Sequence, residues 1–229
     1  MWLWHALAAT REGALFAWGA GGAGQLGNGA RHDAARPVRV ETLAREDVMT
    51  LAAGREHSLA ATRAGLVFAW GSNESGQCGW HGGAAAAPEA SNRPAALDAA
   101  LDETVVSLAA GAAHSALVTA EGRLLTCGDG SYGQLGWCAG GAAKGAAAAV
   151  AAGAGGAAAA AAGGGEGEAA GGGGRGAAPR PAALPRRVVG VACGAYHTVA
   201  LVKRRAEGEA PSPAADGTAL SMGPASAES

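Results

Sequence analysis

Short apolar runs bounded by glycine recur along the chain. Three of them read VMTLAAG (48–54), VVSLAAG (105–111) and VVGVACG (188–194), and three others read ALFAWG (14–19), LVFAWG (66–71) and RLLTCG (123–128). All six are rich in β-branched or small residues, and their apolar positions follow no helical stripe. The pattern predicts short β-strands joined by glycine-containing turns.

Four histidines set the register of a repeat. His5, His57, His114 and His197 are separated by 52, 57 and 83 residues. Three landmarks follow the first three histidines at the same spacings of 52 and 57 residues: a T-x-x-G turn (Thr10 to Gly13, Thr62 to Gly65, Thr119 to Gly122), a Trp-Gly or Cys-Gly pair (Trp18-Gly19, Trp70-Gly71, Cys127-Gly128) and a Gly-Gln pair (Gly24-Gln25, Gly76-Gln77, Gly133-Gln134). An Arg-Pro pair precedes each later histidine, at Arg36-Pro37, Arg93-Pro94 and Arg180-Pro181.

These landmarks divide each repeat into about four strands. One strand leads to G-x-x-H, a second starts at the histidine, a third runs from the T-x-x-G turn to Trp-Gly, and a shorter one lies near Arg-Pro after a glycine-rich loop. Four antiparallel strands repeated about every 50 residues are typical of propeller blades. The sequence therefore predicts an all-β fold built of such blades.

The motifs G-x-x-H-[ST], Trp-Gly and G-Q-[LC]-G at this period resemble the repeats of the regulator of chromosome condensation family. The resemblance covers residues 1 to about 138 and 179 to 202. It implies a seven-bladed β-propeller for complete members. It also implies guanine-nucleotide exchange on a small GTPase of the Ran type, which is the activity of the founding member. The plant UV-B photoreceptor of this family has Trp after the Gly of its G-x-x-H units, and Arg55, Ala112 and Ala195 exclude that function here.

The number of repeats is too small for a closed ring. Seven blades at this period need about 360 residues, whereas the chain has 229 residues and three histidine-to-histidine intervals. The expected T-x-x-G turn and Trp-Gly pair do not follow His197. We therefore expect a partial propeller of about three four-stranded blades. The chain would be a fragment, a truncated gene model or an open arc whose exposed faces favour self-association.

Low-complexity sequence separates the repeats. We predict propeller repeats in residues 1–138, an Ala/Gly insertion in 139–178, a final repeat segment in 179–205 and a tail in 206–229. Small side chains bury too little apolar area to offset backbone entropy, so the insertion and the tail are expected to be disordered. The uncharged run 145–165 lacks the Leu, Ile and Phe that drive membrane insertion, and no membrane anchor is expected.

The repeated residues are predicted to be structural. A group that recurs with its repeat serves packing more often than catalysis, and we expect each histidine ring to bond the backbone within its own blade. No catalytic, cofactor-binding or metal-binding residue is predicted. The structural repeat positions are His5, His57, His114, His197, Trp18, Trp70, Gly24, Gly76, Gly133, Gln25, Gln77 and Gln134.

The cysteines follow the same logic. Cys78, Cys127 and Cys193 stand where other repeats carry Leu, Trp and Ala, so we expect them to act as small hydrophobic side chains. Cys138 has no counterpart. Because no C-x-x-C spacing occurs in the sequence, a zinc site is not expected.

The remaining reactive or aromatic residues also favour packing or solvent exposure. Glu56, Glu74 and Asp129 lie in expected loops and have no paired partner, which argues against an acid–base pair. Trp80 and Trp137 both follow a G-Q-x-G motif, where packing is favoured over a ligand cage.

Charge narrows the class of partners. The formal net charge is −2, from 17 Lys and Arg against 19 Asp and Glu. Nothing here favours binding to a nucleic-acid backbone. Without an export signal or a disulfide framework, we expect an intracellular location, cytoplasmic or nuclear. The sequence predicts a non-enzymatic scaffold that binds other proteins. The alternative, from the family resemblance, is an exchange factor for a Ran-type small GTPase.

Overall fold

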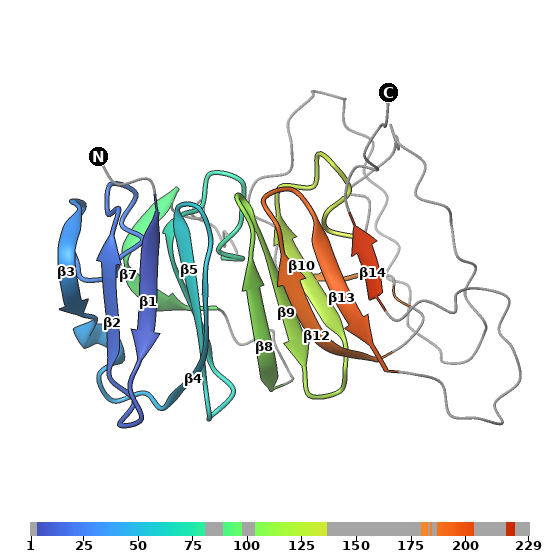
Figure 1. The fold of residues 1–229 in the computed structure, drawn as a ribbon, viewed down its shortest axis with the longest axis horizontal. Coiled ribbons are helices and arrows are strands. Elements are labelled where there is room, and N and C mark those ends of the chain that lie inside the picture. The colour runs from blue at the N-terminus through green and yellow to red at the C-terminus, as the bar shows by residue number, and fades with distance from the viewer. Residues whose placement is uncertain are drawn as a thin grey trace, which may run out of the picture.

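Fourteen described strands build four antiparallel sheets that stand side by side in chain order (Figure 1). The computed structural model describes residues 4–80, 89–97, 104–136, 180–182, 184, 187–203 and 219–222. We name the sheets A to D. Sheet A contains β1 (His5–Ala9), β2 (Leu15–Gly19) and β3 (Ala34–Arg39); sheet B contains β4 (Val48–Ala53), β5 (His57–Thr62), β6 (Val67–Ser72) and β7 (Ala90–Ala96). Sheet C contains β8 (Val105–Ala110), β9 (His114–Thr119), β10 (Leu124–Gly128) and β11 (Arg180–Pro181); sheet D contains β12 (Val188–Cys193), β13 (Thr198–Val202) and β14 (Ala219–Met222).

The sheets confirm the predicted all-β repeat. In sheet B, β4 leads to G-x-x-H, β5 starts at His57, β6 contains Trp70-Gly71 and β7 contains Arg93-Pro94. Sheets B and C each have four strands, and sheets A and D have three among the described residues. The structure is thus a partial propeller of two complete and two three-stranded blades.

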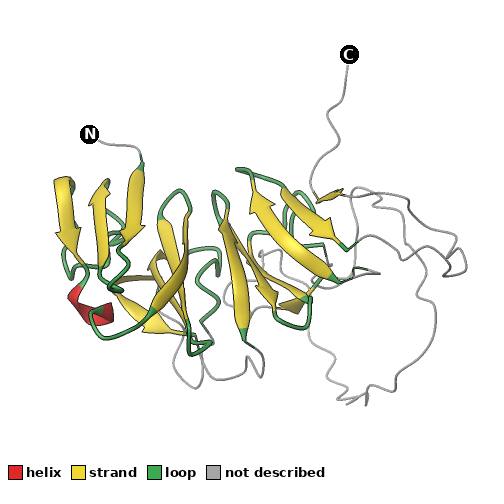
Figure 2. Cartoon of the chain, turned by 60° about the horizontal axis from the view of Figure 1, so that its bottom comes forward, coloured by secondary structure: helices red, strands yellow, loops and turns green. Residues whose placement is uncertain are grey.

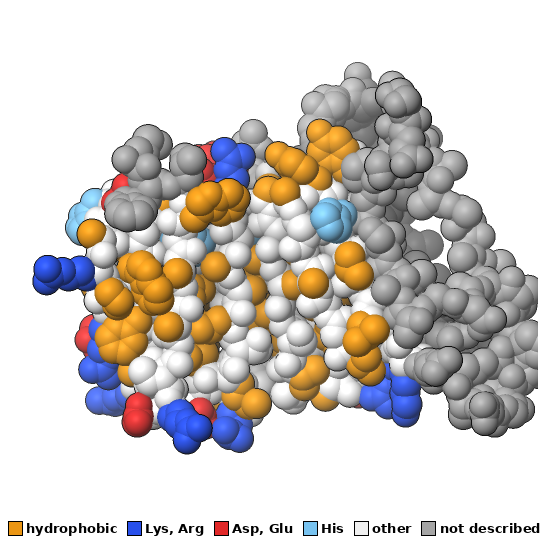
Figure 3. All heavy atoms as spheres, in the orientation of Figure 1, with side chains coloured by type: hydrophobic (Ala, Val, Ile, Leu, Met, Phe, Trp, Pro, Cys, Tyr) orange, Lys and Arg blue, Asp and Glu red, His pale blue; other side chains and the backbone are white. Residues whose placement is uncertain are grey.

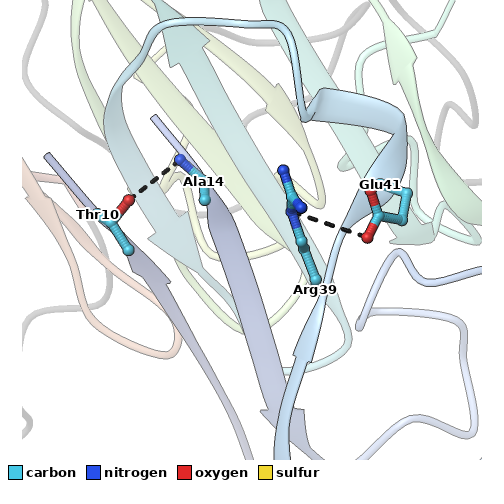
Figure 4. A network of polar contacts seen from close by, with 4 residues as sticks. All are labelled: Thr10, Ala14, Arg39 and Glu41. Carbon is cyan, nitrogen blue, oxygen red and sulfur yellow. Dashed lines mark hydrogen bonds and ion pairs between the residues drawn. The ribbon is translucent and has the colours of Figure 1, made fainter. Parts of the chain in front are cut away.

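A tight hairpin joins the histidine strand to the next strand in sheets A, B and C. In sheet A, the Gly13 N–H donates to the Thr10 carbonyl (3.1 Å), and the Ala14 N–H donates to Thr10 Oγ1 (3.2 Å; Figure 4). The same view shows the exposed ion pair between Arg39 and Glu41 (3.7 Å), at the start of the short 3-10 helix η1 (Glu41–Leu43). Such an exposed pair adds little stability.

The glycine after Trp is required by a close approach of two strands. Gly71 pairs with His57, has a φ of +94°, and a Cβ at Gly71 would overlap the Glu56 carbonyl oxygen. A side chain there would force the two strands apart. The register of the hairpin is therefore fixed at the histidine end.

The first strands of sheets B, C and D lie next to one another. The strands β4, β8 and β12 contact one another in sequence, and Figure 2 shows the sheets side by side along the molecule. Each strand has a register shift after its first residue. Such bulges turn one extra side chain outward. These side chains are all exposed: Met49, Val106 and Val189.

Apolar side chains pack between neighbouring sheets. Leu15 of sheet A clusters with Ala60 and Trp70 of sheet B. The next two clusters repeat this arrangement: Leu59 and Val67 of sheet B with Leu117 and Leu125 of sheet C, and Val118 and Leu124 of sheet C with Val188 and Ala200 of sheet D. Each sheet therefore depends on its neighbour to cover its face.

The last unit contains a strand that the sequence interpretation missed. β14 pairs with β13, and Met222 lies opposite Thr198, as Trp70 lies opposite Ser58 in sheet B. The sequence interpretation found no Trp-Gly pair after His197, but β14 takes the place of the Trp-Gly strand. The sequence at 217–223 reads GTALSMG, which has the spacing of GLVFAWG at 65–71, with Met in place of Trp. Twelve extra residues between Val202 and Gly217 hid this match.

Two other predictions concern mostly undescribed residues. The insertion 139–178 lies outside the described residues, as does the tail 206–229 apart from β14. The structure joins Arg180-Pro181 to β10 as the fourth strand of sheet C, so the insertion separates two strands of one blade. Within the described residues, no helix has the length and apolar character needed to cross a membrane.

Candidate functional site

The repeated histidines lie at the junctions between sheets. His57 and His114 have no exposed surface, His5 is half-buried and His197 is exposed. Each described junction places a histidine from one sheet beside a hydroxyl group from the next. The junctions are thus where the predicted structural residues meet.

One hydrogen-bond relay is repeated at all three junctions. His57 Nε2 lies 2.9 Å from Ser115 Oγ of the next sheet, and this hydroxyl donates to the Gln77 carbonyl (2.7 Å). The corresponding groups are His5, Ser58 and Gln25 (2.7 and 2.8 Å), and His114, Thr198 and Gln134 (3.0 and 2.9 Å). The hydroxyl of each sheet therefore inserts between the histidine and the glutamine carbonyl of the preceding sheet.

This relay corrects the expected role of the histidines. Their ring was expected to bond the backbone of its own blade, but Nε2 reaches a side chain of the next blade. The sequence signal was the Ser or Thr directly after each later histidine, which is part of the G-x-x-H-[ST] motif. The hydroxyl residues Ser58, Ser115 and Thr198 were not predicted as site residues.

The relay determines the protonation state of the ring. The Ser115 hydroxyl donates its hydrogen to the Gln77 carbonyl. Its oxygen therefore accepts a hydrogen bond from Nε2–H of His57. The Nδ1 atom of His57 is buried without a hydrogen-bond partner in the described part of the chain. A second proton on this ring would have no acceptor. The histidine is neutral at physiological pH.

Burial lowers the pKa of these histidines. It lowers the pKa of His57 to about 3, with smaller contributions from repulsion by His5 and His114. Burial also lowers the pKa of His5 to about 4 and that of His114. The rings of His57 and His114 are therefore neutral and lie out of contact with solvent.

The glycine of G-x-x-H is needed for the ring. A Cβ at Gly111 would overlap the imidazole of His114 and lie 2.8 Å from the Gly194 carbonyl oxygen of the next sheet. The backbone also bridges the sheets here, because the Ala112 N–H donates to the Ala195 carbonyl (3.0 Å). Gly and His thus act together to bring two sheets close.

The side chains of the repeated glutamines stabilise the loops in which they lie. The side-chain oxygen of Gln77 accepts from the Ser75 N–H (2.9 Å), and Gln25 and Gln134 accept in the same way from Ala23 (2.9 Å) and Tyr132 (2.8 Å). Each loop is thereby held with its main-chain carbonyl toward the next sheet. Each of these loops also contains a glycine with a positive φ: Gly24, Gly76 and Gly133.

Trp70 covers the loop of the preceding sheet. Its side chain is fully buried, and Nε1 donates to the Gln25 carbonyl (2.8 Å), which also accepts from Ser58. Trp18, at the same position in sheet A, is half-buried. Trp70 therefore belongs to the junction between sheets A and B.

Of the three described cysteines, Cys78 and Cys127 are buried and Cys193 is half-buried. Burial raises the pKa of Cys127 to about 12, that of Cys193 to about 11 and that of Cys78 well above its usual range. A thiol with a raised pKa is a poor nucleophile and a poor metal ligand. All three are free of disulfide bonds, and Cys138 lies outside the described residues.

The acidic candidates do not form a catalytic group. Asp129 accepts hydrogen bonds from the Ser131 N–H (3.0 Å) and from Gln134 Nε2 (3.1 Å), which stabilise its loop. Glu56 and Glu74 are exposed. Among the residues that the structure describes, no three His, Cys, Asp or Glu side chains gather as a metal site.

One of the two tryptophans after G-Q-x-G can be placed. Trp80 is buried, with 7% of its surface exposed, in the cluster between sheets B and C. The predicted packing role is therefore confirmed for Trp80, while Trp137 lies outside the described residues.

An exposed aromatic pair lies at the loop end of sheets C and D. Tyr132 and Tyr196 are 54% and 50% exposed, and their rings contact edge to face with centroids 5.5 Å apart. Trp4, which precedes His5 as Tyr196 precedes His197, is also exposed. Figure 3 shows hydrophobic side chains at this upper edge and over sheet A. The sequence interpretation did not predict this aromatic surface, because neither tyrosine is repeated.

The family comparison matches these repeats. The chain matches the regulator of chromosome condensation (RCC1) repeat over residues 12–61 and 64–118, and a second model of this repeat matches residues 50–77 and 105–134. The matched residues contain the relay between sheets B and C and, apart from His5, the relay between sheets A and B.

Curated relatives share the same part of the chain. Human probable E3 ubiquitin-protein ligase HERC6 is 38% identical over 135 residues, which are 58% of this chain and 13% of the relative. Mouse protein RCC2 is 38% identical over 132 residues, which are 58% of this chain and 24% of RCC2. The chain therefore spans less than a quarter of either relative.

Solved structures have a similar fold. Yeast RCC1 (Prp20), in a crystal structure with Kap60, has a TM-score of 0.64 and 25% identity, and the similarity covers 87% of this chain and 40% of that one. Human WBSCR16 has a TM-score of 0.63 and 21% identity, with 87% and 42% covered. Four sheets of this chain thus correspond to less than half of each structure.

Proposed function

The chain belongs to the regulator of chromosome condensation repeat family, and from this premise we propose that it is a non-enzymatic scaffold that binds other proteins. A propeller fold supports many functions, so the argument depends on the surface of this chain. Apart from the exposed His197, the repeated histidines and glutamines take part in the hydrogen bonds of the junctions between sheets and of their own loops. The surface side chains are then what partners can contact.

The observation that carries the proposal is the aromatic pair Tyr132 and Tyr196. The two rings come from different sheets and are each about half exposed. Exposed tyrosines on rigid loops provide apolar area and a hydroxyl group at low entropic cost, and they are enriched in protein interfaces. The loop of Tyr132 is held in place by its own N–H, which donates to Gln134 Oε1, and by the Ser131 N–H and Gln134 Nε2, which donate to the Asp129 carboxylate.

The buried groups support a non-enzymatic role. The described histidine relay holds its rings neutral, and the described cysteines have raised pKa values. Neither set can serve as an accessible base or nucleophile. An intracellular location, cytoplasmic or nuclear, is part of the proposal.

The experiment compares partners of the wild-type chain and of a Tyr132→Ala/Tyr196→Ala variant. Immobilised proteins capture partners from cell extract, and quantitative mass spectrometry measures each partner. We expect partners of the aromatic surface to fall more than about fivefold, as for interface residues worth over 1 kcal/mol. Leu66→Ala is the matched control, because Leu66 is 50% exposed at the opposite end of sheet B. Equal capture by all three proteins would contradict the proposal.

The second candidate is guanine-nucleotide exchange on a Ran-type small GTPase. The similarity to yeast RCC1 (Prp20) supports it, since sheets A to D superpose on that propeller with a TM-score of 0.64. The test is release of a labelled guanine nucleotide from the GTPase. Faster release at substoichiometric concentrations of the chain supports exchange activity, and an unchanged rate argues for the scaffold alone.

A further inference from the structure

The two ends of the sheets differ in charge. The G-x-x-H turns and the loops with the repeated glutamines lie at one end, which we call the loop end, and the T-x-x-G turns lie at the other. Among the described turns and loops, the loop end has five acidic and two basic residues, a net charge of −3, and the other end has five acidic and six basic residues, a net charge of +1. The charged residues of the loop end are Arg31, Asp33, Arg55, Glu56, Glu74, Glu89 and Asp129, and those of the other end are Arg11, Glu12, Glu41, Arg45, Glu46, Asp47, Arg63, Glu121, Arg123, Arg187 and Lys203. The loop end therefore favours a cationic partner.

Sheet B has two exposed glutamates at the loop end. The Glu56 carbonyl accepts a hydrogen bond from the Ser72 N–H (2.8 Å), two residues before Glu74, so both glutamates belong to the same end of the sheet. Neither side chain forms an ion pair in the described part of the chain. With Glu89 and Arg55, the described loop end of sheet B has a net charge of −2. Two carboxylates are thus available to a cation at this end.

The exposed tyrosine pair lies about one sheet away from these glutamates. Tyr132 belongs to the loop of sheet C and Tyr196 to the G-x-x-H turn of sheet D. In sheet C, which lies between sheets B and D, the residues of the G-x-x-H turn are Ala112 and Ala113, so no bulky group stands there. Neighbouring sheets pack about 10 Å apart, and an extended peptide of roughly eight residues, about 25 Å long, therefore reaches both groups.

Arginine is the side chain that fits both groups. The rings of Tyr132 and Tyr196 are each about half exposed and meet edge to face, which leaves ring faces accessible to solvent. A guanidinium group stacks on such faces, and it donates two parallel hydrogen bonds to a carboxylate. Lysine has a compact ammonium group that stacks less well. Asp129, three residues before Tyr132, adds a negative charge to the loop of this ring.

We propose that a loop-end surface formed by Glu56, Glu74, Tyr132 and Tyr196 binds an arginine-containing, extended segment of a partner protein. One arginine stacks on the tyrosine pair, and a second arginine pairs with the glutamates of sheet B. The inference rests on the proposed scaffold function and names the chemistry of the partner.

The test uses labelled peptides of about eight residues in which Gly alternates with Arg, Lys, Gln or Glu. Fluorescence anisotropy measures the dissociation constant of each peptide with the full chain. We expect the Arg peptide to bind about threefold more tightly than the Lys peptide, because the guanidinium stacks on tyrosine, and about tenfold more tightly than the Gln and Glu peptides. Tyr132→Ala/Tyr196→Ala should remove the preference for Arg over Lys.

Two pairs of substitutions separate the site from the charge of the whole chain. Glu56→Gln/Glu74→Gln should weaken binding of the Arg peptide about fivefold. Glu12→Gln/Glu41→Gln changes the net charge by the same amount at the opposite end and should change this affinity less than about twofold, because salt screens distant charges. All four glutamates are exposed, so the unfolding temperatures of both variants should equal that of the wild-type chain.

Three results would overturn the proposal: no binding of the Arg peptide, equal affinity for the Arg and Gln peptides, or equal losses in the two glutamate variants. A second copy of the chain is the other occupant to test. A dimer seen by sedimentation that dissociates in the Glu56→Gln/Glu74→Gln variant would also overturn the proposal. The scaffold function is judged separately. Partner capture from extract that depends on Tyr132 and Tyr196, but persists in this glutamate variant, would support the scaffold and contradict arginine recognition.

Discussion

The junction between sheets A and B and the junction between sheets B and C use the same hydrogen bonds but fill their volume differently. At the first junction, Trp70 is fully buried and donates to the Gln25 carbonyl at 2.8 Å. At the second, Cys127 holds the position of Trp70 and lies 3.6 Å from the Gln77 carbonyl. A thiol is much smaller than an indole, so another side chain must occupy the remaining space.

At the second junction, the large aromatic side chain comes from the preceding sheet, sheet B. Trp80 follows Gly79 in the loop of sheet B and packs with Leu117 and Leu125 of sheet C. The corresponding residue after Gly27, in the loop of sheet A, is Asn28. The comparison teaches that the relay needs particular atoms at particular positions, whereas core volume can be supplied from either sheet.

The largest expected effect on stability comes from removing the tryptophan that fills each junction. Trp70→Ala and Trp80→Ala should each lower the free energy of unfolding by about 3–5 kcal/mol, because each leaves a large cavity. Cys127→Ala removes one sulfur atom and should cost less than about 1.5 kcal/mol. Urea denaturation of the three variants measures these values. A small cost for Trp80→Ala would show that Trp80 does not replace the indole of the first junction.

A smaller loss of stability is expected from removing the hydroxyl group that both junctions share. Ser115→Ala removes the hydroxyl between His57 and the Gln77 carbonyl, so that His57 Nε2 is left buried without a partner and the carbonyl keeps only the weak contact of the Cys127 thiol at 3.6 Å. We expect a loss of about 1–3 kcal/mol in the free energy of unfolding. Ser58→Ala should cost a similar amount, although its junction contains Trp70. Ser91 of β7 is half-buried and its hydroxyl donates only to the nearby Arg93 carbonyl, so Ser91→Ala is the control outside the relay. A cost near zero for Ser115→Ala alone would break the equivalence of the two junctions.

The relay also predicts a dependence on pH. The folded pKa of His57 is about 3, below the unfolded value of about 6.5, so the unfolded chain binds more protons between these values. Stability is therefore complete above pH 6.5 and decreases as the pH falls toward 3. Each such histidine contributes about 1.4 kcal/mol per pH unit in this window. Lowering the pH from 6.5 to 5 should cost about 2 kcal/mol through His57.

A variant that keeps the donor but cannot titrate isolates this contribution. His57→Gln retains an N–H that can reach Ser115, and its loss of stability between pH 6.5 and 5 should be about 2 kcal/mol smaller than that of the wild-type chain. Urea denaturation at both pH values measures the difference, in which carboxylate titration cancels. Equal losses would mean that His57 is not held neutral in the folded chain.

The parts that could be predicted from the sequence are those set by local geometry. The need for glycine at position 71 and the turn that begins at Thr10 follow from backbone conformation alone. Such turns join consecutive strands as hairpins, which makes them neighbours in the sheet. The partner of His57 could not be predicted, because Ser115 comes from a different repeat and the choice between sheets is a tertiary contact. The motif contained Ser115, but spacing alone does not say which blade its hydroxyl faces.

β14 was missed for a different reason. The match between GTALSMG at 217–223 and the tryptophan strands is clear only when the extra residues before Gly217 are allowed for. The exposed pair of Tyr132 and Tyr196 was not predicted, because comparing repeats identifies only residues that recur. Residues that appear once are where one member of a repeat family differs from another.

The smallest expected effect concerns the loops that follow G-Q-x-G in sheets B and C. The segment between Gly79 and β7 is short, whereas 43 residues separate Gly136 from Arg180 of β11. Deleting residues 140–174 should change the free energy of unfolding by less than about 1 kcal/mol, because the entropy of loop closure varies with the logarithm of length. Urea denaturation of the full chain and the deletion variant checks this, with the slope on denaturant as a control for exposed area. A loss of several kcal/mol would contradict the loop interpretation, because such a cost requires that the Ala/Gly segment packs against the propeller.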